Sequence, residues 1–285
     1  MIEKLFLSVG AMKAGTTWLY DKLKQHPDIH FSPQKEVHFL SHYYGHTNSL
    51  LPVKRQRRAR IAMQAIRAKK EDRNDLLRLR RWYANYKSQP VDYVWFERLM
   101  EADKAGAKYL ADFSNLNCFL TPKDWADIRQ NHVRHLRVVY IMRDPVERTW
   151  SHFKYHLRFS EHPAAKQPDQ DFTLFKDTVG KDWFWRNACY AETVSALTSG
   201  LASDQLKIAY FEDMISEPEQ FLREIEAFIG LPQGRYNSDL RTPRNRSIAT
   251  VLPQPWRSYL NELFEHEFRR LAIAGLGHET WITSP

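Results

Sequence analysis

The stretch "VGAMKAGTTWLYDKL" (Val9–Leu23) decides the fold. It follows a short apolar run, "KLFLSV" (Lys4–Val9), which is typical of a buried β-strand. From Thr17 onward apolar residues recur at helical spacing, until a proline at position 27 ends the run. A turn between a strand and a helix offers backbone amides and the positive end of the helix dipole to an anion. The stretch therefore predicts a phosphate-binding loop.

The spacing of this loop differs from that of a nucleotide triphosphatase. Gly10 and Gly15 have the separation of the Walker A motif, G-x-x-x-x-G-K-[ST], but Thr16 stands where that motif needs its lysine. The lysine is Lys13, ahead of the second glycine, and Thr16 and Thr17 add hydroxyls at the start of the helix. The misplaced lysine argues against a nucleotide kinase on a P-loop-like fold, which stays as an alternative.

The rest of the chain repeats the alternation of strand and helix. An α/β fold follows, with a central, mainly parallel sheet flanked by helices and a P-loop-like nucleotide-binding topology. No linker interrupts the chain, so we expect residues 1–285 to form a single domain. Further strands are predicted at 107–113, 137–143 and 205–212, and helices at about 146–159, 183–199, 218–229 and 255–274.

Two motifs together resemble a known family. "KAGTTWL" (Lys13–Leu19) closely resembles the 5′-phosphosulfate loop of sulfotransferases that use 3′-phosphoadenosine 5′-phosphosulfate (PAPS). "VVYIMRDPVERTWSHF" (Val138–Phe153) resembles the family's 3′-phosphate site, a strand followed by Arg143, a turn, and a helix that carries Ser151. Arginine offers a bidentate fork to phosphate, and serine adds a hydroxyl donor. The resemblance implies an enzyme that transfers a sulfuryl group from PAPS and releases PAP, without a metal.

The resemblance extends over most of the chain. Residues 186–214 resemble the adenine-side helix and a core strand, with Tyr190 at the aromatic position, and 217–232 resemble the next helix. Residues 241–250 take the place of a basic loop that closes over the nucleotide. The implied donor site comprises Lys13, Ala14, Gly15, Thr16, Thr17, Trp18, Arg143, Ser151, Tyr190, Arg244 and Arg246.

A second cluster of polar residues offers a catalytic base. In "QKEVHFL" (Gln34–Leu40), Glu36 and His38 are two residues apart, and on an extended segment they point to one face. The stretch resembles the Glu-x-His-Phe segment of carbohydrate sulfotransferases of the heparan sulfate type, in which the glutamate is the general base. Glu36 is the expected base and His38 its rival. Lys13 is expected to meet the charge that develops on the bridging oxygen.

The histidine spacing around this cluster also invites a metal site. His38, His42 and His46 would share one face of a helix. The sequence lacks an H-E-x-x-H pair, and two tyrosines and a glycine between them weaken a helix. We therefore expect no metal.

The positive charge of the chain is concentrated in one segment. The net charge is +8, and Lys54–Arg81 holds twelve Lys or Arg against three Asp or Glu, so the remainder is nearly neutral. We expect a basic helical insertion at about 45–90 that forms one wall of the acceptor cleft or a solvated face. A nucleic-acid-binding role is the alternative, but no DNA-reading motif is present and no nucleic acid is expected. An anionic acceptor fits this charge: a saccharide, a lipid-linked sugar or a small metabolite.

The remaining composition bears on the compartment. Cys118 and Cys189 are the only cysteines, which gives no disulfide framework. The start of the chain lacks a cleavage pattern, and no apolar run approaches the length of a membrane span. We expect a cytoplasmic protein that is not integral to a membrane.

Overall fold

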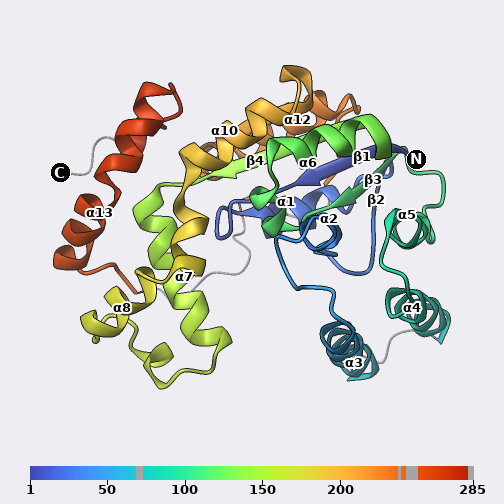
Figure 1. Ribbon diagram of the computed structural model, residues 1–285, viewed down its shortest axis with the longest axis horizontal. Helices are drawn as coiled ribbons and strands as arrows, with labels where there is room; N and C mark the ends of the chain where they lie inside the picture. Colours follow the sequence, from blue (N-terminus) through green and yellow to red (C-terminus); the bar gives the residue numbers. More distant parts are fainter. Residues whose placement is uncertain (69–72, 237–238, 242–249, 282–285) are drawn as a thin grey trace.

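The fold is built on one sheet of five parallel strands, in the order β2-β3-β1-β4-β5 (Figure 1). The computed structural model describes residues 1–68, 73–236, 239–241 and 250–281. The strands are β1 (Ile2–Ser8), β2 (Ile29–Phe31), β3 (Tyr109–Asp112), β4 (Val133–Met142) and β5 (Leu206–Tyr210). β1 lies at the centre, and all its residues from Leu5 to Ser8 are buried, as expected for a strand covered on both faces.

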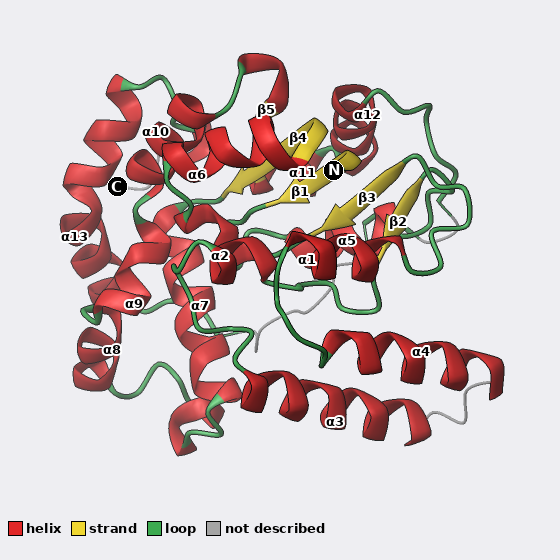
Figure 2. Cartoon of the chain, turned by 45° about the vertical axis from the view of Figure 1, so that its right-hand side comes forward, coloured by secondary structure: helices red, strands yellow, loops and turns green. Residues whose placement is uncertain are grey.

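Helices cover both faces of the sheet (Figures 1 and 2). Successive residues of a strand point to opposite faces. Tyr140 of β4 meets Tyr190 of α10 (Tyr190–Gly200), whereas Arg137 donates a hydrogen bond to the Phe228 carbonyl of α12 (Pro218–Ile229). α10 and α12 therefore lie on opposite faces. α6 (Pro122–Asp127) packs against α10, and α1 (Thr16–Leu23) meets α12 through the edge of Trp18.

Within the described residues, the segment between β2 and β3 holds four helices. They are α2 (Phe39–Tyr43), α3 (Pro52–Ala68), α4 (Arg73–Tyr86) and α5 (Tyr93–Glu101). α3 and α4 pack side by side as a hairpin, apart from the sheet (Figure 2). Trp82 and Tyr86 of α4 stack on one another, and Tyr86 meets Trp95 of α5, so an aromatic layer attaches the hairpin to the body.

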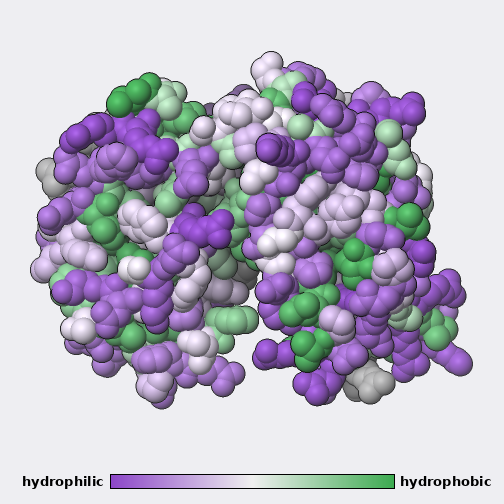
Figure 3. All heavy atoms as spheres, in the orientation of Figure 1, coloured by the Kyte–Doolittle hydropathy of each residue, from purple (hydrophilic) through white to green (hydrophobic). Residues whose placement is uncertain are grey.

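A second apolar core lies beyond the carboxyl end of β4. It joins α7 (Pro145–Phe159), α8 (Phe172–Val179), α9 (Asp182–Trp185) and α13 (Gln254–Ile273). Trp150 of α7 meets both Phe175 of α8 and Trp256 of α13. The space-filling view shows a recess between the α7–α8 side and the α3 side of the molecule (Figure 3).

The predicted α/β class with its mainly parallel sheet is confirmed. Of the predicted strands, 205–212 ends too late, because α11 (Phe211–Ser216) begins directly after Tyr210. β2 is missing from the prediction, since three residues are too short to show a period. The organisation as one domain stays a prediction. None of the helices in the described part of the chain combines the length and apolar content of a bilayer-spanning segment.

Candidate active site

The two predicted phosphate-binding segments meet at the carboxyl ends of neighbouring strands. After β1 the chain crosses to the β2 side of the sheet, and after β4 it crosses to β5. Such a reversal opens a crevice in which α/β proteins bind ligands. Arg143, directly after β4, donates from Nη1 to the carbonyl oxygen of Lys13 at 3.2 Å. The sequence-predicted loops thus form one site at the switch point.

The loop after β1 adopts a backbone that Gly15 makes possible. Gly15 has φ 83° and is the N-cap of α1, and Lys13 also lies in the left-handed region at φ 71°. A Cβ on Gly15 would lie 2.1 Å from Cε of Met214, so the position has neither the dihedral nor the space for a side chain. Ala14 is fully buried beside it. The amides at the start of α1 are held in one fixed geometry.

The amine of Lys13 lies in a strongly positive environment. Its Nζ sits 4.5 Å from the centre of the Tyr155 ring on α7. Burial, followed by the positive charges of Arg158, Arg143 and Lys35, lowers the pKa of Lys13 to about 8. Holding several cations this close together costs electrostatic free energy, because like charges repel. An anion bound among them would lower that cost.

Lys35 joins the phosphate loop to the predicted base. Its Nζ donates to Oγ1 of Thr16 at 3.2 Å and of Thr17 at 3.1 Å, and lies 3.3 Å from Oε1 of Glu36. Lys35 is not among the site residues predicted from the sequence, although it directly precedes Glu36. One ammonium group therefore places the carboxylate of Glu36 next to the two threonine hydroxyls.

The segment that carries Glu36 and His38 is fastened to the end of β3. The amide of Val37 donates to Oδ1 of Asp112 at 2.9 Å, and the amide of His38 donates to Oγ of Ser114 at 2.7 Å. Burial raises the pKa of Asp112 to about 6, and its hydrogen bond from Val37 opposes this rise. Asp112 ends a parallel strand and Ser114 follows it, so they hold the proposed base at the same edge of the sheet as Lys13 and Arg143.

The backbone of this segment is not a strand, contrary to the extended geometry considered from the sequence. His38 has φ 61° and is the N-cap of α2. The turn nonetheless brings Nε2 of His38 to 3.2 Å from Oε2 of Glu36. Burial raises the pKa of Glu36, but the hydrogen bond from His38 and the charge of Lys35 outweigh it and leave that pKa below its usual range. Glu36 is therefore ionised near neutral pH.

The other two histidines of the considered metal set turn elsewhere. Nδ1 of His42 pairs with the Thr47 carbonyl, and Nε2 of His46 lies 2.7 Å from Asp124. Within the described residues, no group of three or more His, Cys, Asp or Glu is placed to hold a metal ion.

The remaining predicted site residues lie at different depths. The Arg143 guanidinium lies 4.5 Å over the Phe211 ring, and its Nη2 is 4.0 Å from Glu147, which also pairs with Arg257 of α13. Ser151 is buried on α7, close behind Arg143 in sequence.

Two aromatic residues of the predicted donor site are core residues in this structure. Trp18 is buried, and its Nε1 donates to the Leu240 carbonyl at 3.1 Å. Tyr190 is fully buried against Tyr140. Arg244 and Arg246 lie outside the described residues.

Comparisons with known proteins agree with this geometry. A model of the sulfotransferase family matches residues 6–235. The chain is similar to a sulfotransferase from Alicyclobacillus acidocaldarius, with 20% identity, a TM-score of 0.61 and 99% of both chains covered. It is also similar to the sulfotransferase domain from the curacin biosynthetic pathway, with 15% identity, a TM-score of 0.57, and 97% of this chain and 99% of that one covered.

A third similar structure is the sulfotransferase domain of the Synechococcus PCC 7002 olefin synthase, with 16% identity, a TM-score of 0.51, and 93% of this chain and 96% of that one covered. Identities this low show a shared fold. Among curated proteins no match was found. The family model covers most of the chain, including the Lys13 loop and Arg143. The chain belongs to the sulfotransferase family.

Proposed function

We propose that this sulfotransferase moves a sulfuryl group from PAPS to a hydroxyl, or an amine, of a saccharide or small metabolite. The observation that carries the proposal is the position of Lys35, whose amine contacts Thr16, Thr17 and Glu36. It joins the phosphate-binding loop to a carboxylate that can accept a proton. Donor and acceptor chemistry can therefore share one centre.

The donor set of the crevice suits a doubly phosphorylated nucleotide. Lys13, Lys35 and Arg143 supply positive charge, and the start of α1 supplies amides and two hydroxyls. In the proposal, the Lys13 loop holds the 5′-phosphosulfate, and Arg143 with Ser151 holds the 3′-phosphate. Arg143 would exchange its distant Glu147 partner for the phosphate, because a guanidinium forms a stronger, bidentate pair with that group.

The chemistry assigns one task to each charged residue. The acceptor oxygen forms a bond to sulfur while the bond from sulfur to the phosphate oxygen breaks, and the acceptor proton passes to the Glu36 carboxylate. Negative charge then develops on the phosphate oxygen, where the ammonium of Lys13 would stabilise it. PAP leaves with that charge, and Glu36 later returns its proton to water.

Glu36 is preferred to His38 as the base because of its surroundings. The carboxylate is 29% exposed, whereas the His38 side chain is 7% exposed, and one His38 ring nitrogen already points at Glu36. His38 then orients the carboxylate. The Glu36–His38–Phe39 order supports an acceptor of the carbohydrate class. Because Cys118 and Cys189 are free thiols, the proposal includes a reducing, cytoplasmic setting.

The test uses the purified chain. PAP should raise its thermal stability by about 2.7 kcal/mol at a hundredfold excess over the dissociation constant, and Mg-ATP, which lacks the 3′-phosphate, should do much less. Incubation with PAPS and a panel of acceptors should then give a product heavier by one sulfuryl group. Equal stabilisation by Mg-ATP would instead support a nucleotide kinase.

A further inference from the structure

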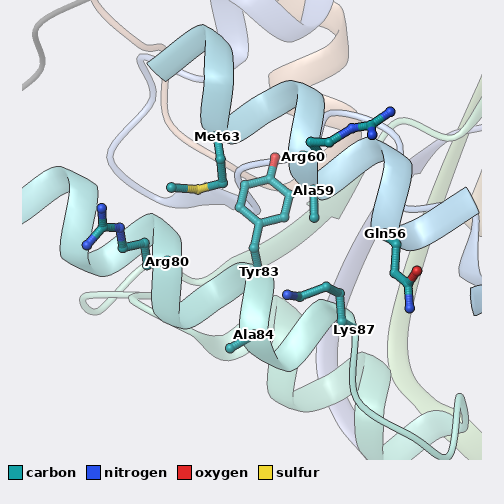
Figure 4. A pocket seen from close by; sticks show the side chains of 8 residues that line it. All are labelled: Gln56, Ala59, Arg60, Met63, Arg80, Tyr83, Ala84 and Lys87. Atoms are coloured by element: carbon teal, nitrogen blue, oxygen red, sulfur yellow. The ribbon is translucent and has the colours of Figure 1, made fainter. Parts of the chain in front are cut away.

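The hairpin of α3 and α4 encloses a groove that the proposed chemistry does not use. The groove has a volume of about 320 Å³, within the range of small-ligand sites. Figure 4 shows Tyr83 pointing from α4 toward α3, with Met63 beside its ring and with Arg80 and Lys87 on either side of it along α4. Arg60 lines the groove from α3. The floor is thus partly apolar and the rim is cationic.

The positive charge of this groove has no acidic partner among the residues that the structure describes. No acidic residue lines it, and in the described part of the chain none of Arg60, Arg80 and Lys87 forms an ion pair. Other cations of the hairpin have structural tasks. Arg55 is buried and donates to the carbonyls of Leu50, Tyr86 and Ser88, and Arg78 lies within 4 Å of Asp75 and Asp103. Arg60, Arg80 and Lys87 have no such structural contact among the described residues, and they line the groove.

The groove is connected to the catalytic segment by one hydrogen bond. Nε2 of Gln34 donates to the hydroxyl of Tyr83, which lies at the base of the groove. Gln34 precedes Glu36 by two residues, so their Cα atoms are at most about 7 Å apart. A ligand in the groove therefore lies within reach of an acceptor group at Glu36.

We infer that the groove binds the anionic part of the acceptor, away from the hydroxyl or amine that receives the sulfuryl group. Arg80 and Lys87 leave α4 two turns apart, about 10 Å along the helix. Arg60 faces them from α3. This spacing suits an extended acceptor with several sulfate, carboxylate or phosphate groups, rather than a single small anion. The inference rests on the proposed function and names its substrate class.

The test compares two triple charge reversals of the same composition. One is Arg60→Glu, Arg80→Glu and Lys87→Glu, which changes the groove. The other is Lys54→Glu, Arg57→Glu and Arg81→Glu, which changes exposed cations of the same helices that do not line the groove. Calorimetry measures the binding of a short dextran sulfate chain, with neutral dextran of the same length as the control probe. The groove variant should lose about tenfold or more in affinity, and the control variant less than about threefold.

Binding of PAP separates the inference from the proposed function. Both variants should retain PAP binding, and this binding also shows that they fold. If the groove variant does not bind PAP, the milder double variant Arg80→Ala with Lys87→Ala takes its place. Failure of PAP to bind the unmodified chain would refute the proposed function. Intact PAP binding with equal loss of dextran sulfate affinity in both variants would refute only the inference. The inference would also be refuted if the groove variant lost affinity for anionic phospholipid vesicles or duplex DNA but not for dextran sulfate.

Discussion

The lowered pKa of Lys13 makes a quantitative prediction about nucleotide binding. With a pKa of about 8, the ammonium is about nine-tenths charged at pH 7 and about one-tenth charged at pH 9. If PAP binds only the protein in which Lys13 is charged, the apparent dissociation constant of PAP should rise about tenfold from pH 7 to pH 9. Binding above pH 8 should also take up a proton, because a bound phosphate restores the charge of Lys13.

Isothermal calorimetry in two buffers of different ionisation enthalpy measures both the affinity and the proton uptake. Lys13→Arg is the matched control, because guanidinium stays charged throughout this range and its affinity profile should be flat. Arg158→Ala is the second variant. Arg158 is the first of the neighbouring charges that lower the pKa of Lys13, so its removal should move the midpoint of the profile to higher pH.

The reasoning fails if the affinity of the unmodified chain for PAP changes by less than about twofold between pH 7 and pH 9. It fails equally if Lys13→Arg keeps the full pH dependence, since another group would then be titrating. A profile that Arg158→Ala leaves unchanged would show that Arg158 does not contribute to the lowered pKa of Lys13.

Three further predictions concern single positions. Arg143→Ala should weaken PAP binding by about 1.5–3 kcal/mol and leave binding of adenosine 5′-phosphosulfate, which lacks the 3′-phosphate, nearly unchanged; an equal calorimetric loss for both ligands would remove Arg143 from this role. Glu36→Gln should lower kcat by roughly 10²–10⁴-fold at constant PAP affinity, and full activity in this variant together with inactive His38→Ala would make His38 the base. Gly15→Ala should cost about 2–4 kcal/mol in denaturant unfolding, from the left-handed backbone and the clash with Met214; measured in a Met214→Ala background, the same change should cost only the backbone part.

The sequence predicted the sheet and singled out the Lys13 and Arg143 segments because their signals are local. Phosphate binding by these segments stays a prediction. Gly15 and Lys13 are two residues apart, and Arg143 follows directly on an apolar strand, so each segment carries its own pattern. The order of parallel strands then brings their ends together. This is why Arg143 and Lys13 could be assigned to one site without a structure, although their direct hydrogen bond was not predicted.

The parts that could not be predicted depend on long-range contacts. Asp112 and Ser114 fasten the Glu36 segment across more than seventy positions of sequence, and neither residue belongs to a recognisable motif. The sequence likewise gave no reason to bury Tyr190, which the packing against Tyr140 determines. Arg158 influences Lys13 only because α7 passes over the loop after β1.

The position of the helical hairpin between β2 and β3 has an evolutionary consequence. Lys13 and Arg143 lie in the loops that follow β1 and β4, whereas Glu36, α3 and α4 all belong to one uninterrupted stretch between β2 and β3. In the proposed function this stretch selects the acceptor, so selection could replace it as a single segment while the proposed donor residues Lys13 and Arg143 stay in place. Exchanging this stretch between relatives, with Asp112 and Ser114 kept as its anchors, offers a direct route to enzymes with new acceptor ranges.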